Sequence, residues 1–210
     1  MKNKTLKEQN SKLIWTFFSY NVVLFYLVGL SQIVCLSKFD IASFISIRGA
    51  WVLIIPLLLF ILNGIISSNL KAIIVFWKIK NPLPACRAFS YFADYDDRID
   101  KNYLIQKFNP LPVTPKQQNS LWYKIYKEHQ ENPIIKKSHK DFLLARDISS
   151  IALLFFFFGG VSILIISPHA FKWLYISFLL LQYLIFAIIA QNHGNRFVCN
   201  TLAIETSKEI

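Results

Sequence analysis

The chain has 210 residues, of which 54% are hydrophobic, with a mean hydropathy of +0.41 and a formal net charge of +11. So much apolar material in so short a chain leaves no room for a second large soluble domain. The composition therefore indicates an integral membrane protein with a basic polar portion.

Four apolar stretches, each about 18 to 23 residues long, dominate the chain and cover residues 14–36, 51–68, 148–166 and 171–190. A helix needs roughly 20 apolar residues to cross the ~30 Å hydrocarbon core of a bilayer, because backbone amides cannot stay unpaired in lipid. We therefore predict an all-α protein with four transmembrane spans in two pairs. A small, basic helical cytosolic domain, residues 69–147, is inserted between the second and third spans.

The first apolar stretch follows a basic N-terminus, as the apolar region of a secretory signal peptide does. It is longer than the 7–15 residues typical of such a region, and no small-x-small cleavage site follows Cys35. We interpret it as a retained signal-anchor. Residues 1–68 then hold a cytosolic tail and the first two spans, and residues 148–210 hold the last two spans and a second cytosolic tail.

The distribution of basic residues predicts the orientation in the membrane. Lys and Arg number four in residues 1–13, fourteen in 69–147 and two in 191–210. Because cytoplasmic segments are enriched in these residues, both termini and the central domain are predicted to face the cytoplasm. The richness in Lys, Ile, Asn and Phe suggests a low-GC bacterial gene. The expected location is therefore the bacterial inner membrane, crossed several times.

Few polar side chains interrupt the spans, and none of the span interiors holds a carboxylate, His, Lys or Arg, which argues against an ion-coupled carrier. The candidates for packing or for a pore are Asn21, Asn63, Gly159, Gly160 and Gln182. Amides and small residues hold helices together in lipid, so these positions can join spans or identical copies in a cyclic homo-oligomer. In the other interpretation the amides line an aqueous path, which bulky apolar side chains can gate by dewetting.

The second and third spans are predicted to continue beyond the membrane as stalks. No helix breaker occurs before Asn81-Pro82, so residues 50–80 are expected to form one straight helix. Ser138 and Asp141 have the spacing of a capping box, which predicts a helix that starts at Ser138 and runs into the third span. Two such stalks suit the transmission of a cytosolic event into the bilayer.

Within the central domain we predict short helices separated by prolines. One is expected from about Asp97. Another is expected over residues 115–131, because Thr114 can cap it, Pro115 fits its first position and Gln117 completes a capping box. The cysteines have no metal-ligand spacing, and free thiols are predicted at Cys35, Cys86 and Cys199.

Two groups of side chains in the central domain are candidates for a binding site. The first is a basic group that can form an anion pocket for a nucleotide, a lipid phosphate or an acidic partner: Arg87, Arg98, His139 and Arg146. Ordinary basic charge at a cytoplasmic membrane border is the simpler explanation of this group. The second is a weak candidate for a divalent metal site, the acidic residues Asp96, Asp97 and Asp100. Acidic side chains also favour the first turn of a helix without any metal.

Catalytic motifs are missing: there is no Walker loop, dinucleotide fingerprint, nucleophile elbow or zinc-protease motif. We therefore expect no enzymatic activity and no cofactor. Nucleic acid is not expected as a direct ligand either, because no nucleic-acid-binding motif occurs and acidic residues are interspersed with the basic ones.

Three functions remain open. The first is an oligomeric, channel-like or membrane-perturbing effector, in which the cytosolic domain senses a ligand or partner and alters the membrane bundle. The second is an adaptor that recruits a soluble protein to the inner membrane, and the third is a metal-dependent enzyme acting on lipid headgroups through the acidic cluster. The layout of two spans, a basic module and two spans resembles that of small membrane proteins of bacterial anti-phage defence systems, which implies a role in antiviral defence.

Overall fold

The computed structural model describes residues 5–34, 47–166 and 171–207, and this part of the chain contains helices but no strand. The long apolar elements are α1 (Leu6–Val34), α3 (Ile47–Ile65), α8 (Pro133–Leu154), which continues through the π-helical turn η3 (Phe155–Gly159) into α9 (Gly160–Ile166), and α10 (Phe171–Thr206). The shorter elements are α4 (Ser68–Phe76), η1 (Pro84–Arg87), η2 (Ala88–Phe92), α5 (Ala93–Tyr95), α6 (Lys101–Lys107) and α7 (Pro115–His129). The all-α prediction is confirmed for the described residues.

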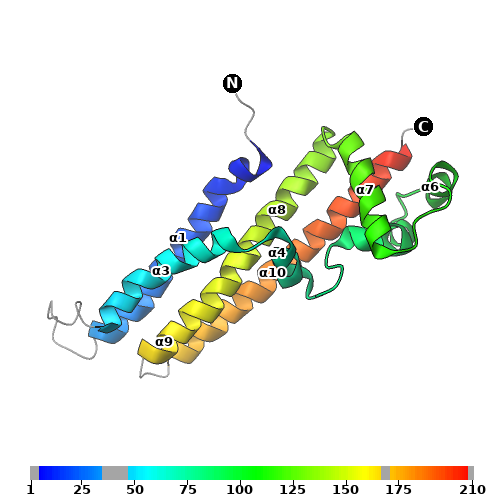
Figure 1. The fold of residues 1–210 in the computed structure, drawn as a ribbon. Coiled ribbons are helices and arrows are strands. Elements are labelled where there is room, and N and C mark those ends of the chain that lie inside the picture. The colour runs from blue at the N-terminus through cyan, green and yellow to red at the C-terminus, as the bar shows by residue number, and fades with distance from the viewer. Residues whose placement is uncertain (1–4, 35–46, 167–170, 208–210) are drawn as a thin grey trace.

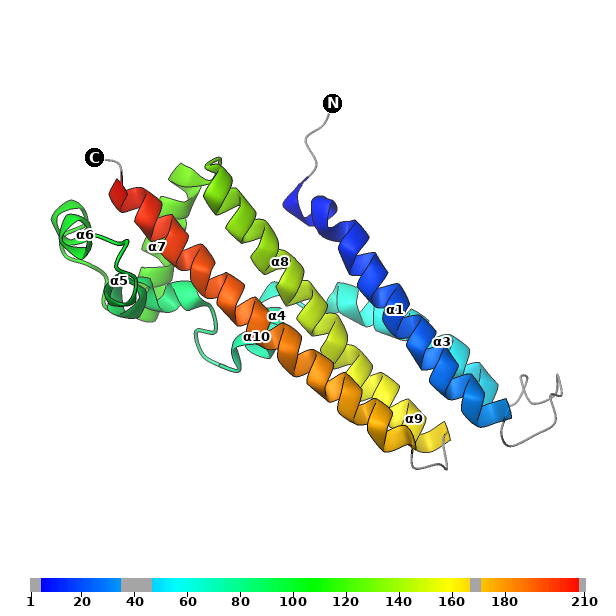
Figure 2. The same cartoon turned by 180° about the vertical axis from the view of Figure 1, so that it is seen from behind.

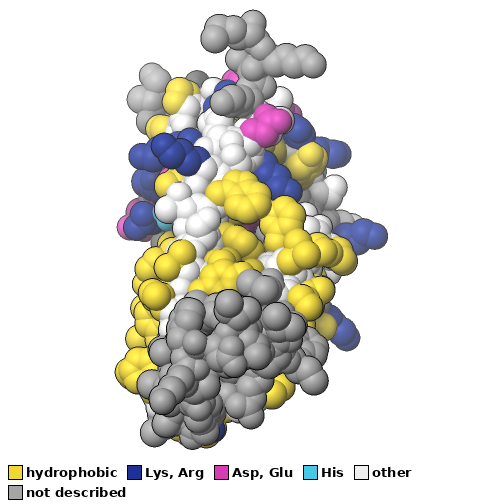
Figure 3. All heavy atoms as spheres, turned by 90° about the vertical axis from the view of Figure 1, so that its left-hand side faces the viewer, with side chains coloured by type: hydrophobic (Ala, Val, Ile, Leu, Met, Phe, Trp, Pro, Cys, Tyr) yellow, Lys and Arg dark blue, Asp and Glu magenta, His cyan; other side chains and the backbone are white. Residues whose placement is uncertain are grey.

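Three helices are long and apolar enough to cross a membrane: α1, the continuous helix Pro133–Ile165, and α10. A fourth candidate span is the pair α3 and α4, which is bent by 102°. These lengths and compositions indicate a multi-pass membrane protein. On the face drawn in Figure 3, hydrophobic side chains gather over the middle and lower part, and most charged side chains lie above them.

The long helices form two pairs, α1 with α3 and α8–α9 with α10, and α8 lies between α1 and α10 (Figure 1, Figure 2). The two pairs meet around a core of buried side chains that includes Phe25, Leu59, Phe155 and Leu179. Helix α1 begins and α10 ends at the same end of the bundle (Figure 1). The segment between the pairs is therefore held at that end.

The straight helix predicted over residues 50–80 is wrong. Helix α3 ends at Ile65, and α4 begins at Ser68 after the 102° bend. Ser67 caps the new helix, because its backbone is extended and its hydroxyl accepts a hydrogen bond from the N–H of Leu70 at 3.2 Å. Trp77 ends α4 in the left-handed conformation. The serine pair thus starts a second helix instead of extending the first.

Helix α4 lies against α8 and α10 instead of projecting away from them. The indole N–H of Trp77 donates to Tyr183 Oη at 2.9 Å, and Tyr183 in turn donates to the carbonyl of Ile74 at 2.9 Å. The amide of Gln191 donates to the carbonyl of Val75 at 2.7 Å. These bonds attach the chain leaving the first helix pair to a helix of the second pair.

The stalk predicted for the third span exists, but it starts earlier than expected. Helix α8 begins at Pro133, and the side chain of Asn132 caps it by accepting from the N–H of Ile134 at 2.9 Å. Ser138 is no cap: it lies inside the helix and donates to the carbonyl of Ile134 at 2.9 Å. Asn132 caps the free N–H of Ile134 and Pro133 has no N–H, so the helix is already started before Ser138.

Residues 78–146 pack against the last turns of α10, residues 191–207, and we call these two segments together the helical module. Its core buries Leu104, Trp122 and Ile125 against Phe197 and Leu202 of α10. Because these turns of α10 carry core side chains, the helix continues to Thr206. The segment predicted as a C-terminal tail after residue 190 is thus a helical part of the module up to Thr206.

The local helix signals in the module are partly confirmed. Thr114 caps α7 by accepting from the N–H of Gln117 at 3.4 Å, although α7 ends at His129 and not at residue 131. The helix expected from Asp97 begins at Lys101, because the carboxylate of Asp100 accepts from the N–H of Tyr103 at 3.1 Å. The thiols of Cys86 and Cys199 are free and buried, and Cys35 lies outside the described residues.

Gly194 sets how closely α4, α8 and α10 approach one another. A Cβ at this position would lie 2.7 Å from Phe76 Cζ and 3.1 Å from Phe142 Cε2, both on buried rings. Gly194→Ala is therefore expected to lower the free energy of unfolding by about 1–3 kcal/mol through overpacking. Chemical unfolding in detergent micelles, followed by circular dichroism, measures this change.

Gly64→Ala is the matched control for Gly194→Ala. A Cβ on Gly64 meets no atom within 4 Å, and the position is helical. We expect no loss of stability, and a gain of up to about 1 kcal/mol, because Ala is the better helix former. Equal losses for both variants would contradict a specific contact at Gly194.

Candidate functional site

A pocket of about 240 Å³ lies where α1, the α3–α4 bend and α8 meet, and we call it the boundary pocket. Its polar side chains come from elements far apart in sequence and are Lys7, Ser11, Asn63, Ser68, Lys71, Arg146 and Asp147. Its apolar wall includes Ile14, Trp15, Phe18, Phe60 and Ile151. The pocket therefore joins a charged rim to an apolar interior.

Asp147 is the centre of the polar contacts. Its Oδ1 accepts from Lys71 Nζ at 3.2 Å and from Arg146 at 3.3 Å (Nε) and 3.2 Å (Nη2). Lys71 Nζ also donates to Asn63 Oδ1 at 3.4 Å. The network thus links α4 and the end of α3 to α8 through buried charged groups.

The charges in this network do not balance. The side chains of Lys71, Arg146 and Asp147 are 8%, 14% and 4% exposed, so two largely buried cations share one carboxylate. Lys7 lines the same pocket, and its positive charge acts on Lys71. Burying a charge is costly unless it is paired. The boundary pocket therefore carries a surplus of positive charge and is suited to hold an anion.

The bend between α3 and α4 creates this pocket. In a straight helix, residues 63 and 71 would be eight positions apart along one rod, roughly 12 Å along its axis. The cap at Ser67 turns α4 across the bundle, and Lys71 then reaches back to Asn63 while it meets Asp147. The residues that line the pocket thus depend on the bend that the sequence prediction missed.

The four basic residues predicted to form one anion pocket are not brought together. Arg146 lines the boundary pocket, whereas Arg87 lines a separate cavity beside Tyr91. The guanidinium of Arg98 donates to Asp96 at 2.6 and 2.9 Å. The ring of His139 stacks on a phenylalanine of α10 inside the helical module. Only Arg146 among them contributes to the site described above.

The predicted acidic cluster has structural partners. Two hydrogen bonds from Arg98 hold the pKa of Asp96 well below its ordinary value, at about 2. Asp100 is the cap of α6, and Asp97 is exposed. Among the described residues, these carboxylates are not part of a group with metal-ligand geometry. The metal site predicted at Asp96, Asp97 and Asp100 is therefore not formed in the structure.

The polar and small residues of the spans lie inside the protomer. Asn21 is fully buried and donates to the carbonyl of Phe17 at 3.0 Å, and its Oδ1, like Oε1 of Gln182, has no hydrogen-bond partner among the described residues. A Cβ on Gly159 or Gly160 would be in ordinary contact, at 3.7–3.9 Å, with side chains of the same chain. Within one protomer the chain's own helices cover Asn21, Gly159, Gly160 and Gln182, whereas Asn63 is half-buried. Contact between identical copies stays a prediction.

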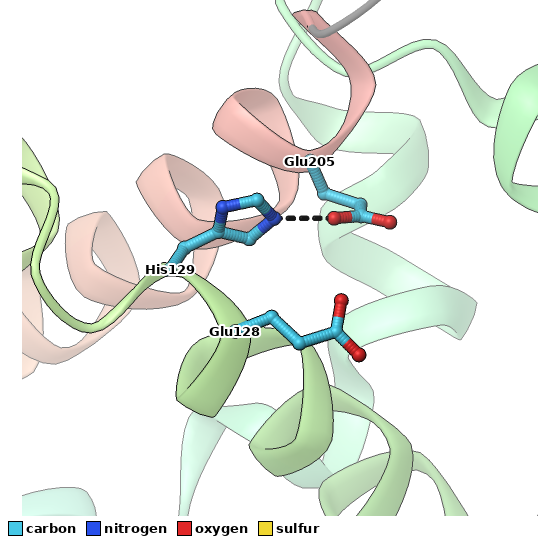
Figure 4. A group of neighbouring side chains, drawn as sticks. All are labelled: Glu128, His129 and Glu205. Atoms are coloured by element: carbon cyan, nitrogen blue, oxygen red, sulfur yellow. Dashed lines mark hydrogen bonds and ion pairs between the residues drawn. The ribbon is translucent and has the colours of Figure 1, made fainter.

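The structure also assembles a group that sequence analysis missed, formed by Glu128, His129 and Glu205 (Figure 4). Glu205 is fully buried at the end of α10, where it accepts from His129 Nε2 at 2.5 Å and from Lys107 Nζ at 2.6 Å. The bond to Glu205 raises the pKa of Lys107. Two ligands of one zinc ion, each at about 2.0–2.1 Å, would be roughly 3.3 Å apart. The observed contact therefore fits an ion pair that fastens α6 and α7 to α10.

Comparison with models of protein families, with curated proteins and with solved structures finds no match to this chain. The assignment of a function therefore rests on the membrane spans, the helical module and the boundary pocket.

Proposed function

We propose that the chain is an effector of the bacterial inner membrane, in which a ligand or partner bound on the cytoplasmic side changes the packing of the membrane spans. The helical module and both termini face the cytoplasm in this proposal, as the clustering of basic residues favours. The observation that carries it is the continuity of α8–α9 and α10, which run as long helices from the module into the bundle.

Such continuity favours mechanical coupling between the two parts of the protein. A displacement at the module end of a rigid helix is passed along its length, whereas a flexible linker would absorb it. The boundary pocket lies between the two helix pairs, because residues of α1, α3, α4 and α8 line it. A ligand in that pocket is therefore placed to move one pair relative to the other.

The test is the membrane potential of cells that express the chain, followed with a potential-sensitive dye. Expression is expected to depolarise the membrane, and Arg146→Ala and Asn63→Leu are each expected to reduce the effect several-fold at equal amounts of inserted protein. Lys124→Gln is the control, because Lys124 lies on the exposed face of α7. An unchanged potential with the wild-type chain would contradict the effector and favour the adaptor, which capture of a soluble partner would then test.

A further inference from the structure

The boundary pocket combines three features that attract the same kind of ligand. The first is the pair of largely buried cations, Lys71 and Arg146, which share a single oxygen of Asp147. The second is Lys7, which adds a further positive charge to the lining. With one acidic side chain against three basic ones, the lining has a formal charge of +2.

The third feature is the start of α4. Ser68, the first residue of this nine-residue helix, lines the pocket. The first amides of a helix point their N–H groups outward and carry the positive end of the helix dipole, which favours bound anions. Hydroxyl groups of Ser11 and Ser68 lie in the same lining as hydrogen-bond donors. Basic side chains, the first residue of a helix and two hydroxyl groups therefore line one cavity.

We infer that the boundary pocket binds the phosphate group of an anionic ligand. A guanidinium and ammonium groups around a helix start form the donor set that phosphate oxygens prefer. The volume of about 240 Å³ exceeds the ~30 Å³ of a single water molecule several times, so a phosphate with part of its substituent fits. This inference rests on the proposed function, for which it supplies the ligand class, but binding itself requires no change in conductance.

Two sources supply this chemistry, and the apolar wall accommodates both. Trp15, Phe18 and Phe60 lie beside the charged rim, so the acyl chain of an anionic phospholipid can follow the wall while its phosphate meets Arg146. The base or another apolar part of a soluble phosphate compound can occupy the same wall. The shared requirement is a phosphate at Lys71 and Arg146.

Binding is measured with the full chain in maltoside detergent micelles, which contain no phosphate. In one arm, pyrophosphate is titrated by calorimetry. In the other, native mass spectrometry counts the molecules of phosphatidylglycerol or of phosphatidylcholine that the protein retains. Saturable binding of pyrophosphate, one per chain, identifies a soluble source. Preferential retention of one phosphatidylglycerol per chain identifies a lipid source, and either result supports the phosphate site.

Substitutions locate the ligand within the pocket. Arg146→Gln is expected to weaken binding at least tenfold, and Lys124→Gln is expected to leave it unchanged. Asp147→Asn removes the carboxylate that competes for both cations, so it is expected to tighten binding several-fold, and pyrophosphate should raise its unfolding temperature more than that of the wild type. Absence of binding in both arms overturns the inference. Equal weakening by Arg146→Gln and Lys124→Gln also overturns it, as does weaker binding by Asp147→Asn at a temperature where circular dichroism shows that variant to be folded.

These experiments test the phosphate site and the effector function independently of each other. A chain that binds phosphate as described but leaves the membrane potential intact contradicts the effector and retains the site. A chain that depolarises the membrane without binding in either arm contradicts the phosphate site and retains the effector.

Discussion

Replacing Asp147 by asparagine is expected to lower the free energy of unfolding by about 3–5 kcal/mol, the usual cost of removing one partner from a buried ion pair. The reason is that the side chains of Lys71 and Arg146, 8% and 14% exposed, would lose their only carboxylate contact in the pocket. The loss should appear as a lower midpoint in denaturant titrations of the protein in mixed micelles, followed by circular dichroism.

Two further variants separate the ion pair from general damage to α8. Asp141→Asn changes a half-buried carboxylate six residues earlier in the same helix and is expected to cost less than about 0.5–1 kcal/mol. The double variant Lys71→Met with Asp147→Leu replaces the pair by apolar groups and is expected to recover most of the stability. A double variant as unstable as Asp147→Asn would show that the pair itself is not the cause.

The membrane part of the fold was predictable because it depends on local composition. Long apolar runs with few charged residues predict spans wherever they occur, and the structure has long apolar helices over 14–34, 148–165 and 171–190. The cap at Thr114 was predictable for a similar reason, since its donors and acceptors lie within four residues.

The bend between α3 and α4 was also encoded locally, but the signal was ambiguous. Serine is tolerated inside a helix and is also one of the best residues to start one, so Ser67-Ser68 fits both interpretations. What decides between them is the contact of α4 with the rest of the bundle, where Lys71 meets Asp147 from 76 positions away. A propensity of a few tenths of a kcal/mol is small beside the cost of moving Lys71 away and leaving the buried Asp147 with one partner fewer.

The boundary pocket itself could not be assembled from the sequence, because its cations come from three helices. Arg146 was a candidate, but its partners were expected among Arg87, Arg98 and His139, which the structure places elsewhere. A signal was present nevertheless. Asp147 is an acidic residue directly before an apolar stretch, and such a residue needs a cation nearby.

The last residues of α10 also make contacts in the helical module that the sequence does not reveal. Residues after 190 are more polar than the span before them, which fits a tail, yet Phe197, Val198 and Leu202 recur at helical spacing and enter the module core. Glu205 then lies completely buried between Lys107 and His129. Its role follows only from that three-way contact.

Glu205→Leu is accordingly expected to lower the free energy of unfolding by about 3 kcal/mol, because it removes two charge-assisted hydrogen bonds and leaves the buried His129 without its partner. The helices joined by this residue are α6, α7 and α10, so the loss should be greatest in the helical module. Hydrogen exchange followed by mass spectrometry should therefore show faster exchange over residues 101–129 while α1 and α3 remain as protected as in the wild type.

Glu128→Leu distinguishes this ion pair from a metal centre. Glu128 is exposed and belongs to the same group of three, but in an ion-pair arrangement it does not bond to Glu205 or His129. Its loss is therefore expected to cost less than about 0.5 kcal/mol, as for other surface substitutions, and a chelator should leave the unfolding midpoint of the wild type unchanged. If instead Glu128→Leu were as damaging as Glu205→Leu, and the chelator lowered the midpoint, a bound cation would be holding the three side chains together. Lys107→Met would then be harmless, whereas an ion pair requires it to destabilise the module.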